Sequence, residues 1–307
     1  MIANFDELLA VVKDLPQQRV AVAVAQDEAV LSAVRYVAEQ KIADFILVGN
    51  TGKIKAVADK LDVSLDGIEI VHEPDDKQAA RRAVALVSGG QATVLMKGFI
   101  NTADLLRAVL DKEYGLRGGR VLSHAAVFDI PGYNRLLTVT DGGMNIAPGL
   151  QQKADIIQNS IGVTRMLGID PAKVAVLAAV EVVNPDMPVT MEAAALAKMA
   201  DRGQIKGAII DGPLALDNAV SLEAARHKGI VSPVAGTADI LVVPNIEVGN
   251  VLGKSLLYFA QARMAGLILG GSRPVIVTSR ADSHESKVMS IALGALLGQS
   301  AETGKLG

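Results

Sequence analysis

The pair Ser279-Arg280 combines a hydroxyl with a guanidinium and follows directly on the short apolar run Pro274–Thr278. That run is typical of a buried strand, and Asp282-Ser283 just beyond it is typical of the cap of a helix that continues to about Leu297. These two groups, at the carboxyl end of a strand and beside a helix N-terminus, favour binding of an anion. The sequence therefore predicts an anion site at Ser279 and Arg280.

A second anion site is predicted in the segment Lys97–Arg107, which follows the apolar run Ala92–Met96. Thr102 is expected to cap a helix in this segment, so that the free N–H groups of the first turn would hold a phosphate oxygen. Arg107 lies near the second turn and could fold back over the same anion. The alternative is an ordinary capped helix with a solvated arginine, and the spacing alone favours neither.

Two further segments carry polar groups beside glycines. In Thr140–Pro148, Asp141 and Asn145 flank two glycines that would allow a ligand to approach closely, although a tight structural loop is the simpler interpretation. The segment Glu247–Ser255 resembles a phosphate-binding loop, but only three residues separate its glycines where that motif has four. It is therefore not an ATPase motif.

Other catalytic motifs are missing from the sequence. The chain has no cysteine, which excludes a cysteine acyl-enzyme, and it has no dinucleotide fingerprint. Its four histidines are scattered without the spacing of metal ligands, and His284 alone falls within one of the segments above. We expect no metal site, and the two anion sites indicate phosphate chemistry on a small metabolite.

Composition limits the class of protein. With 307 residues the chain is long enough for about two domains, and its hydrophobic fraction of 50% supports a large core. The net charge is −3 and no basic stripe interleaved with aromatics occurs, so we expect no nucleic-acid partner. The apolar runs are too short to span a membrane and no signal pattern begins the chain, so we expect no membrane partner and a soluble cytoplasmic protein.

Strand and helix patterns alternate along the chain, and the strands are continuous apolar runs of the kind found in parallel sheets covered on both faces. The sequence thus predicts an α/β fold. In the first part we expect strands at Arg19–Ala25, Phe45–Val48, Ile68–Val71 and Ala92–Met96, and helices at Asp27–Gln40, Thr51–Leu61 and Asp75–Ser88.

The pattern changes after the glycine- and arginine-rich link Gly115–Arg120, where two adjacent strands joined by a turn predict a hairpin and a new domain near residue 119. The expected strands of this part are Val121–Phe128, Arg135–Thr140, Lys173–Ala179, Ile205–Ile210 and Ile240–Val243. Helices are expected at Gln151–Leu167 and about Asn250–Ala265.

Taken together, these segments resemble the phosphate acyltransferase family. The resemblance runs from Thr93 to about Gly294 and rests on the order and spacing of four strings: Lys97–Leu106, Asp141–Pro148, Thr237–Asn250 and Arg273–Lys287. The strings Leu122–Ala125, Gly212–Ala219 and Ser279–Ser283 look like the butyryl branch of the family rather than the acetyl branch.

The resemblance implies reversible transfer of a butyryl group between coenzyme A and inorganic phosphate, with coenzyme A as a substrate and no cofactor. It implies two α/β domains with mostly parallel sheets and an interdomain cleft, similar to the isocitrate and isopropylmalate dehydrogenases. The first domain would comprise 1–118 plus 270–307, and the second, 119–269, would join two chains into a homodimer. Catalysis is assigned to Ser279, Arg280 and Arg107, and phosphate or coenzyme A binding to Lys97, Asn101, Thr102, Asp141, Asn145, Asn250 and Lys254.

One departure from the family pattern concerns the general base. The acetyl branch carries an aspartate six residues beyond the arginine that matches Arg280, and this chain has Ser286 there. The base is therefore left open, and direct attack of phosphate on the thioester in a ternary complex is the simplest mechanism. The alternatives are an acetyl-preferring enzyme, a metal- and nicotinamide-dependent dehydrogenase, and a non-catalytic protein that binds coenzyme A or an acyl phosphate.

Overall fold

The chain folds into two compact units, and the computed structural model describes residues 1–279 and 282–302. Unit 1 comprises Met1–Asn4 and Val121–Met264, and unit 2 comprises Phe5–Arg120 and the residues from Ala265 onward. Unit 2 is thus built from both ends of the sequence. The sequence-based domain bounds at 118/119 and 269/270 stay a prediction.

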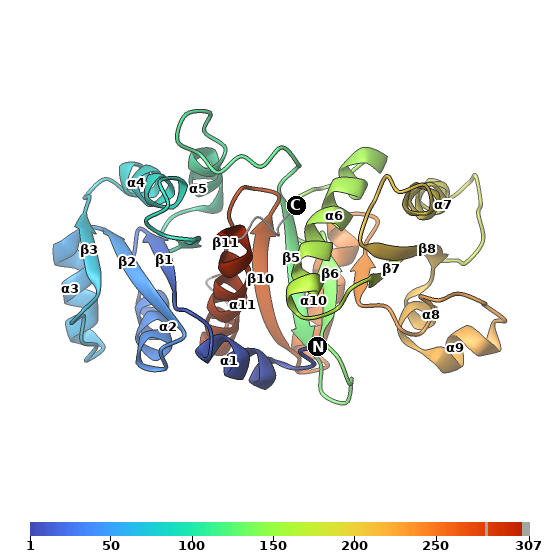
Figure 1. Cartoon of the computed structure of the whole chain (residues 1–307), viewed down its shortest axis with the longest axis horizontal. Coiled ribbons are helices and arrows are strands. Elements are labelled where there is room, and N and C mark those ends of the chain that lie inside the picture. The colour runs from blue at the N-terminus through green and yellow to red at the C-terminus, as the bar shows by residue number, and fades with distance from the viewer. Residues whose placement is uncertain (280–281, 303–307) are drawn as a thin grey trace. The chain divides into compact units, whose positions relative to one another are not determined.

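Unit 2 is a largely parallel sheet in the order β3-β2-β1-β4-β11-β10. The pairs β1–β2, β2–β3, β1–β4 and β4–β11 are parallel, and β10–β11 is antiparallel. Helices α4 and α5 cover one face, and α1, α2 and α11 cover the other (Figure 1). The strands are β1 (Gln18–Ala23), β2 (Ala43–Gly49), β3 (Glu69–His72), β4 (Val94–Lys97), β10 (Arg263–Leu269) and β11 (Val275–Ile276). The helices are α1 (Phe5–Lys13), α2 (Glu28–Glu39), α3 (Thr51–Lys60), α4 (Asp76–Ser88), α5 (Thr102–Val109) and α11 (His284–Glu302).

The strands of unit 2 are continuous apolar runs because both faces of the sheet are covered. Residues Val20–Ala25 of β1 and its carboxyl end are completely buried, as are Val94–Met96 of β4. Burial of such aliphatic side chains contributes about 1.5–3 kcal/mol each. The α/β class predicted from the sequence is confirmed by this sheet and its helices.

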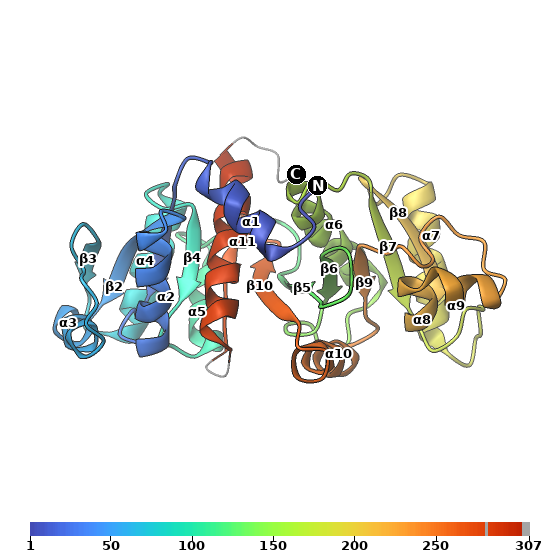
Figure 2. The same ribbon diagram turned by 90° about the horizontal axis from the view of Figure 1, so that it is seen from below.

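Unit 1 has its own sheet in the order β5-β6-β9-β7-β8, which begins with the predicted antiparallel hairpin of β5 and β6. Two apolar clusters join the sheet to its helices, one to α6 and α7 and the other to α8, α9 and α10; Figure 2 shows these helices. The strands are β5 (Ser123–Asp129), β6 (Leu137–Thr140), β7 (Ala172–Leu177), β8 (Ala208–Leu214) and β9 (Ile240–Val242). The helices are α6 (Leu150–Met166), α7 (Pro188–Asp201), α8 (Leu216–Val220), α9 (Leu222–His227) and α10 (Ile246–Tyr258).

The expected helix Asn250–Ala265 was wrong at both ends. Helix α10 begins after Asn245, whose side chain accepts a hydrogen bond from the Val248 N–H, and it ends at Tyr258. Gln261 then takes a left-handed conformation with φ 52°, which separates the helix from strand β10. Asparagine is among the strongest helix caps, which accounts for the start of α10 directly after Asn245.

Candidate active site

A cavity of about 370 Å³ lies within unit 2 over the carboxyl ends of β1 and β4. From β1 the chain proceeds outward to β2 and β3, then returns to place β4 on the other side of β1. The gap between the β1 and β4 loops is therefore the topological switch point of the sheet, the position at which open α/β sheets bind ligands. The cavity is lined by Gln26, Asp27, Glu28, Ala29, Val30, Val57, Lys97, Gly98, Phe99, Thr278, Ser279 and Lys287.

The cavity brings together two residues that the sequence assigned to the separate anion sites, Lys97 and Ser279. Lys97 ends β4, and its Nζ donates to the Gly98 carbonyl at 3.2 Å. Ser279 is exposed beyond β11, where its N–H donates to Asp282 Oδ2 at 2.7 Å. Arg280, the third predicted member, lies outside the described residues.

The predicted cap of α11 is confirmed at Ser283, whose Oγ accepts from the Ser286 N–H at 3.0 Å. Ser286 is buried, and its hydroxyl is also bonded to Ser283 Oγ, at 3.1 Å. Ser286 thus belongs to the cap of the helix. His284 lies against α2, with its ring edge on Tyr36 and its Nδ1 at 3.2 Å from Ser32 Oγ.

Helix α5 is capped by Asn101 and not by Thr102, which corrects the sequence-based assignment. The Asn101 side chain accepts from the Asp104 N–H at 2.8 Å, and Thr102 is the first helical residue. Asparagine and threonine are both good caps, and asparagine is the somewhat stronger of the two. The helix therefore begins at the first suitable side chain after Ile100.

Asp104 holds the two predicted anion-binding side chains of this helix. Its carboxylate accepts hydrogen bonds from the Asn101 amide and the Arg107 guanidinium. The Asn101 bond and then the Arg107 bond hold the pKa of Asp104 below its usual range. The Arg107 side chain is nevertheless 71% exposed, so an arriving anion has access to it. Phosphate contact by Asn101, Thr102 and Arg107 stays a prediction.

In unit 1, Asp141 is the organising residue of the loop after β6. Its carboxylate is 2% exposed and accepts from the N–H groups of Gly143 and Met144 at 2.9 Å and of Asn145 at 3.2 Å. The Asn145 side chain donates to Asp141 at 2.7 Å and to the Leu122 carbonyl at 2.9 Å. These bonds give Asp141 and Asn145 a structural part in the loop, and their contact with substrate stays a prediction.

Replacing Asp141 by alanine is expected to lower the free energy of unfolding by about 2–4 kcal/mol, because the N–H groups of Gly143, Met144 and Asn145 all lose their charged, buried acceptor. Urea denaturation measures this change. Asp141→Asn keeps one acceptor oxygen and should fall between wild type and alanine. A midpoint of Asp141→Ala within error of wild type would contradict this structural part.

The same loop packs closely on the first turns of α10. A Cβ on Gly249 would lie 2.6 Å from the Gly142 Cα, so the two backbones meet where any side chain would intrude. This contact places Asn250 beside the loop of Asp141, while Lys254 lies one turn further along α10. Both side chains are exposed, and their contact with substrate also stays a prediction.

Two features of unit 1 and unit 2 were missed in the sequence. Lys287, on the first turns of α11, is 2% exposed and lines the cavity, although a lysine there is ordinarily solvated.

In unit 1, Lys228 Nζ bridges Glu181 at 2.7 Å and Asp217 at 3.2 Å. The Glu181 bond and then the Asp217 bond raise the pKa of Lys228, and buried Asn218 also donates to Glu181. The bridge ties the loop after β7 to helices α8 and α9.

No group of three or more histidine, cysteine, aspartate or glutamate side chains is placed to hold a metal ion in 1–279 and 282–302. In the same part of the chain, no helix combines the length and apolar character needed to cross a membrane.

The chain belongs to the family described as Phosphate acetyl/butaryl transferase, whose sequence profile matches residues 5–82 and 76–295. It is 53% identical over 297 residues to phosphate butyryltransferase of Clostridium acetobutylicum, with 97% of this chain and 99% of the relative covered. It is 48% identical over 279 residues to phosphate acetyltransferase of Thermotoga maritima, with 91% and 95% covered.

Solved structures share the fold. A branched-chain phosphotransacylase from Enterococcus faecalis is 36% identical, with a TM-score of 0.81 over 92% of this chain and 99% of its own. The 4-hydroxythreonine-4-phosphate dehydrogenase of Klebsiella pneumoniae is 14% identical, with a TM-score of 0.58 over 92% and 100%. The second likeness concerns the fold alone and agrees with the predicted similarity to a dehydrogenase fold.

Proposed function

We propose that the protein transfers a butyryl group reversibly between coenzyme A and inorganic phosphate. The observation that carries the proposal is the cavity at the switch point of unit 2, where Ser279 and Lys97 meet in a chain that is 53% identical to a phosphate butyryltransferase. Coenzyme A acts as a substrate, and the reaction uses no cofactor.

The reaction proceeds by direct attack in a ternary complex. A phosphate oxygen attacks the thioester carbonyl, a C–O bond forms, and a tetrahedral oxyanion results. Its collapse breaks the C–S bond and releases butyryl phosphate and the coenzyme A thiolate, which takes up the proton lost by phosphate. Arg107 and Arg280 hold the phosphate and offset the charge of the intermediate, and the Ser279 hydroxyl donates a hydrogen bond to it.

In this mechanism the two reactants exchange the proton between themselves. The reaction therefore does not require the aspartate that the acetyl branch carries at the position of Ser286. The buried Ser286 hydroxyl is bonded to Ser283 and is not a base. In the phosphorolysis direction the thiolate is a good leaving group with a pKa of about 8.5, so little acid assistance is required. In the reverse direction the departing phosphate accepts the thiol proton.

The test is thiol release from butyryl-coenzyme A and from acetyl-coenzyme A, each with and without phosphate. We expect release that depends on phosphate and is faster with butyryl-coenzyme A. Faster release with acetyl-coenzyme A would favour the second candidate, an acetyl-preferring enzyme, which the Thermotoga maritima relative supports. A rate of thiol release that does not depend on phosphate would contradict both candidates.

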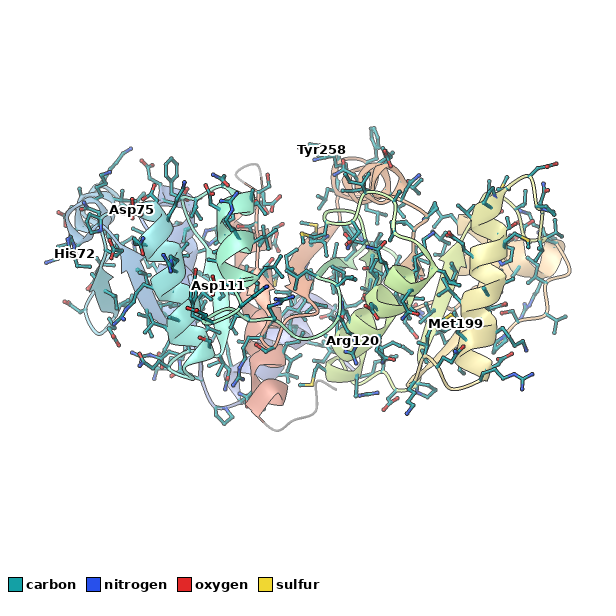
Figure 3. All side chains as sticks on the ribbon, turned by 90° about the horizontal axis from the view of Figure 1, so that it is seen from above. His72, Asp75, Asp111, Arg120, Met199 and Tyr258 are labelled. Atoms are coloured by element: carbon teal, nitrogen blue, oxygen red, sulfur yellow. The ribbon has the colours of Figure 1, made fainter. Side chains whose placement is uncertain are left out.

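Two further properties belong to the proposal. We place the enzyme in the cytoplasm, where coenzyme A and phosphate are available, and we propose that it forms a homodimer through unit 1. The dimer is supported by the exposed apolar side chains Val248, Val251 and Tyr258 along α10, with Tyr258 prominent in Figure 3. Sedimentation measures the oligomeric state: we expect a dimer for wild type and a shift toward monomer for Val251→Glu. A wild-type monomer would contradict the proposed dimer.

A further inference from the structure

Lys287 is a buried cation for which the reaction as outlined has no use. Its side chain comes from the first turns of α11 and is 2% exposed. The ammonium donates to the Asp282 carbonyl at 2.7 Å and to the Ser279 carbonyl at 3.3 Å. No carboxylate of the described residues forms an ion pair with it. A buried charge with only neutral partners is costly, so an opposite charge is expected to join it.

An anionic ligand bound in the cavity that Lys287 lines would supply this opposite charge. An ammonium has three N–H donors, and two carbonyls leave Lys287 with a donor to spare. Lys97 and Ser279 line the same cavity, so a second cationic residue and a hydroxyl-bearing residue stand at its wall. The site therefore offers several donors to an anion with several acceptor oxygens.

The two acidic residues of the cavity wall do not cancel this preference. Glu28 is paired with Lys60 at 2.5 Å, on the outside of unit 2. Asp27 caps α2, with its carboxylate accepting from the Val30 N–H at 2.9 Å. The charge of Glu28 is thus offset by Lys60, and that of Asp27 faces the positive N-terminal end of α2, whereas Lys287 forms no ion pair with a carboxylate of the described residues.

The volume and the apolar part of the wall limit the ligand. About 370 Å³ corresponds to about a dozen water molecules. That space is large enough for inorganic phosphate or a short acyl phosphate. Ala29, Val30 and Val57 add an apolar surface on which a short acyl chain could lie.

We propose that this cavity binds the phosphoryl group shared by inorganic phosphate and the acyl phosphate, and that Lys287 is its buried counter-charge. The proposal deepens the function proposed above and rests on it for the identity of the acyl phosphate. It adds to the reaction a phosphate-binding residue from α11 that is not among the residues assigned from the sequence.

The first experiment measures binding of inorganic phosphate alone, by thermal shift and calorimetry, and needs no turnover. We expect phosphate to stabilise the wild type, and Lys287→Met to weaken its binding by about tenfold or more. Lys153→Met is the matched control, because it also removes a buried ammonium, 3% exposed and paired with Glu192 in unit 1. This control should keep the phosphate response of wild type even if it melts earlier.

The second experiment separates the two phosphate-bearing substrates from coenzyme A. Lys287→Met should raise the KM for phosphate and for butyryl phosphate by about tenfold or more, and leave the KM for coenzyme A within about twofold. A rise for coenzyme A alone would overturn the proposal and assign the cavity to a phosphate of coenzyme A. Unchanged phosphate binding would also overturn it.

A purely structural part for Lys287 is tested by Asp282→Ala. That variant removes the bond between the Ser279 N–H and Asp282 Oδ2 but keeps the Lys287 ammonium. Equal losses of phosphate binding in Asp282→Ala and Lys287→Met would overturn the charge-bearing part. We expect the loss in Lys287→Met to be several-fold larger.

A pair of variants at Val57 keeps the test independent of the folding of Lys287→Met. Val57 is half-buried in the cavity wall, so Val57→Glu adds a negative charge and Val57→Gln a neutral group of the same shape. We expect only the glutamate to weaken phosphate binding, and equal effects would contradict an anion site. If phosphate binds through Lys287 but wild type releases no thiol, the cavity assignment stands and the proposed acyl transfer fails.

Discussion

Replacement of Arg107 by alanine is expected to lower kcat/KM for phosphate-dependent thiol release by about 10²-fold. Arg107 is proposed to hold the phosphate and to offset the negative charge of the tetrahedral intermediate, so its contribution is largest in the transition state. Its side chain is 71% exposed, and its one ion pair among the described residues is with Asp104 of the same helix. Exposed pairs of this kind contribute little to stability, so the free energy of unfolding should hardly change. Steady-state kinetics and urea denaturation measure the two effects separately.

The controls use the partner of Arg107 and a comparable arginine. Arg107→Ala leaves the Asp104 carboxylate beside the proposed phosphate, so Asp104→Asn in the same chain should recover part of the lost activity. Arg35→Ala removes an arginine from an exposed pair with Glu39, elsewhere in unit 2, and should leave kcat/KM within about twofold. Normal turnover by Arg107→Ala would remove Arg107 from the site.

Replacement of Gly98 by alanine is expected to disturb both the fold and the cavity. A Cβ on Gly98 would lie 2.2 Å from the Val24 carbonyl oxygen and 2.7 Å from that of Ala23. The Gly98 N–H also donates to the Ala23 carbonyl at 2.8 Å, and the Phe99 N–H donates to the Val24 carbonyl at 2.7 Å. The loop after β4 must therefore move away from β1, and overpacking of this kind costs about 1–3 kcal/mol or more.

The movement of Gly98 carries the cavity-lining residues Lys97 and Phe99 with it. Val24 does not easily give way, because it is a buried β-branched residue already held at φ 59°, in the left-handed region. Since misplacement of a binding group by about 1 Å lowers rates by up to about 10²-fold, we expect a loss of that order in kcat/KM.

Gly52→Ala is the matched control for this substitution. A Cβ on Gly52, in the exposed first turn of α3, would meet nothing closer than Asn50 Oδ1 at 3.4 Å. That change should leave activity at the wild-type value and preserve or slightly raise stability, since alanine favours helix by up to about 1 kcal/mol. If Gly98→Ala had the kcat/KM and melting temperature of wild type, the prediction would be wrong and the β4 loop would move without cost.

Much of the fold could be predicted because its strands are buried on both faces and its helices begin with recognisable caps. Asp27 and Asp75 cap α2 and α4 as expected. The prediction failed between Asn245 and Leu269, where β10 reads Arg-Met-Ala-Gly-Leu-Ile-Leu. Leucine, methionine and alanine favour helix in isolation, and the segment becomes a strand through tertiary pairing, such as that of Ile268 with Val275 of β11.

The candidate site was predicted only in part, because its parts depend on tertiary structure. Ser279 and Lys97 were found from their places after strands, and the cavity brings both to its wall. Lys287 gave no signal, since nothing in a helical pattern distinguishes a lysine that turns inward from one that is solvated. Asp141 was recognised as polar, but its bonds to the loop that follows are visible only in the folded chain.

The discontinuity of unit 2 has a consequence for the order of events at the ribosome. The β1 and β4 loops emerge early, but Ser279 and Lys287 arrive only after all of unit 1 has been translated. Until β11 and α11 emerge, the edge of β4 lacks its neighbouring strand, and α1 and α2 lack the helix that packs on them, so these surfaces are open to chaperones. Unit 1 can meanwhile fold from an almost continuous stretch of chain. The proposed phosphate cavity is therefore incomplete on the nascent chain, and we expect binding competence to be acquired late in synthesis.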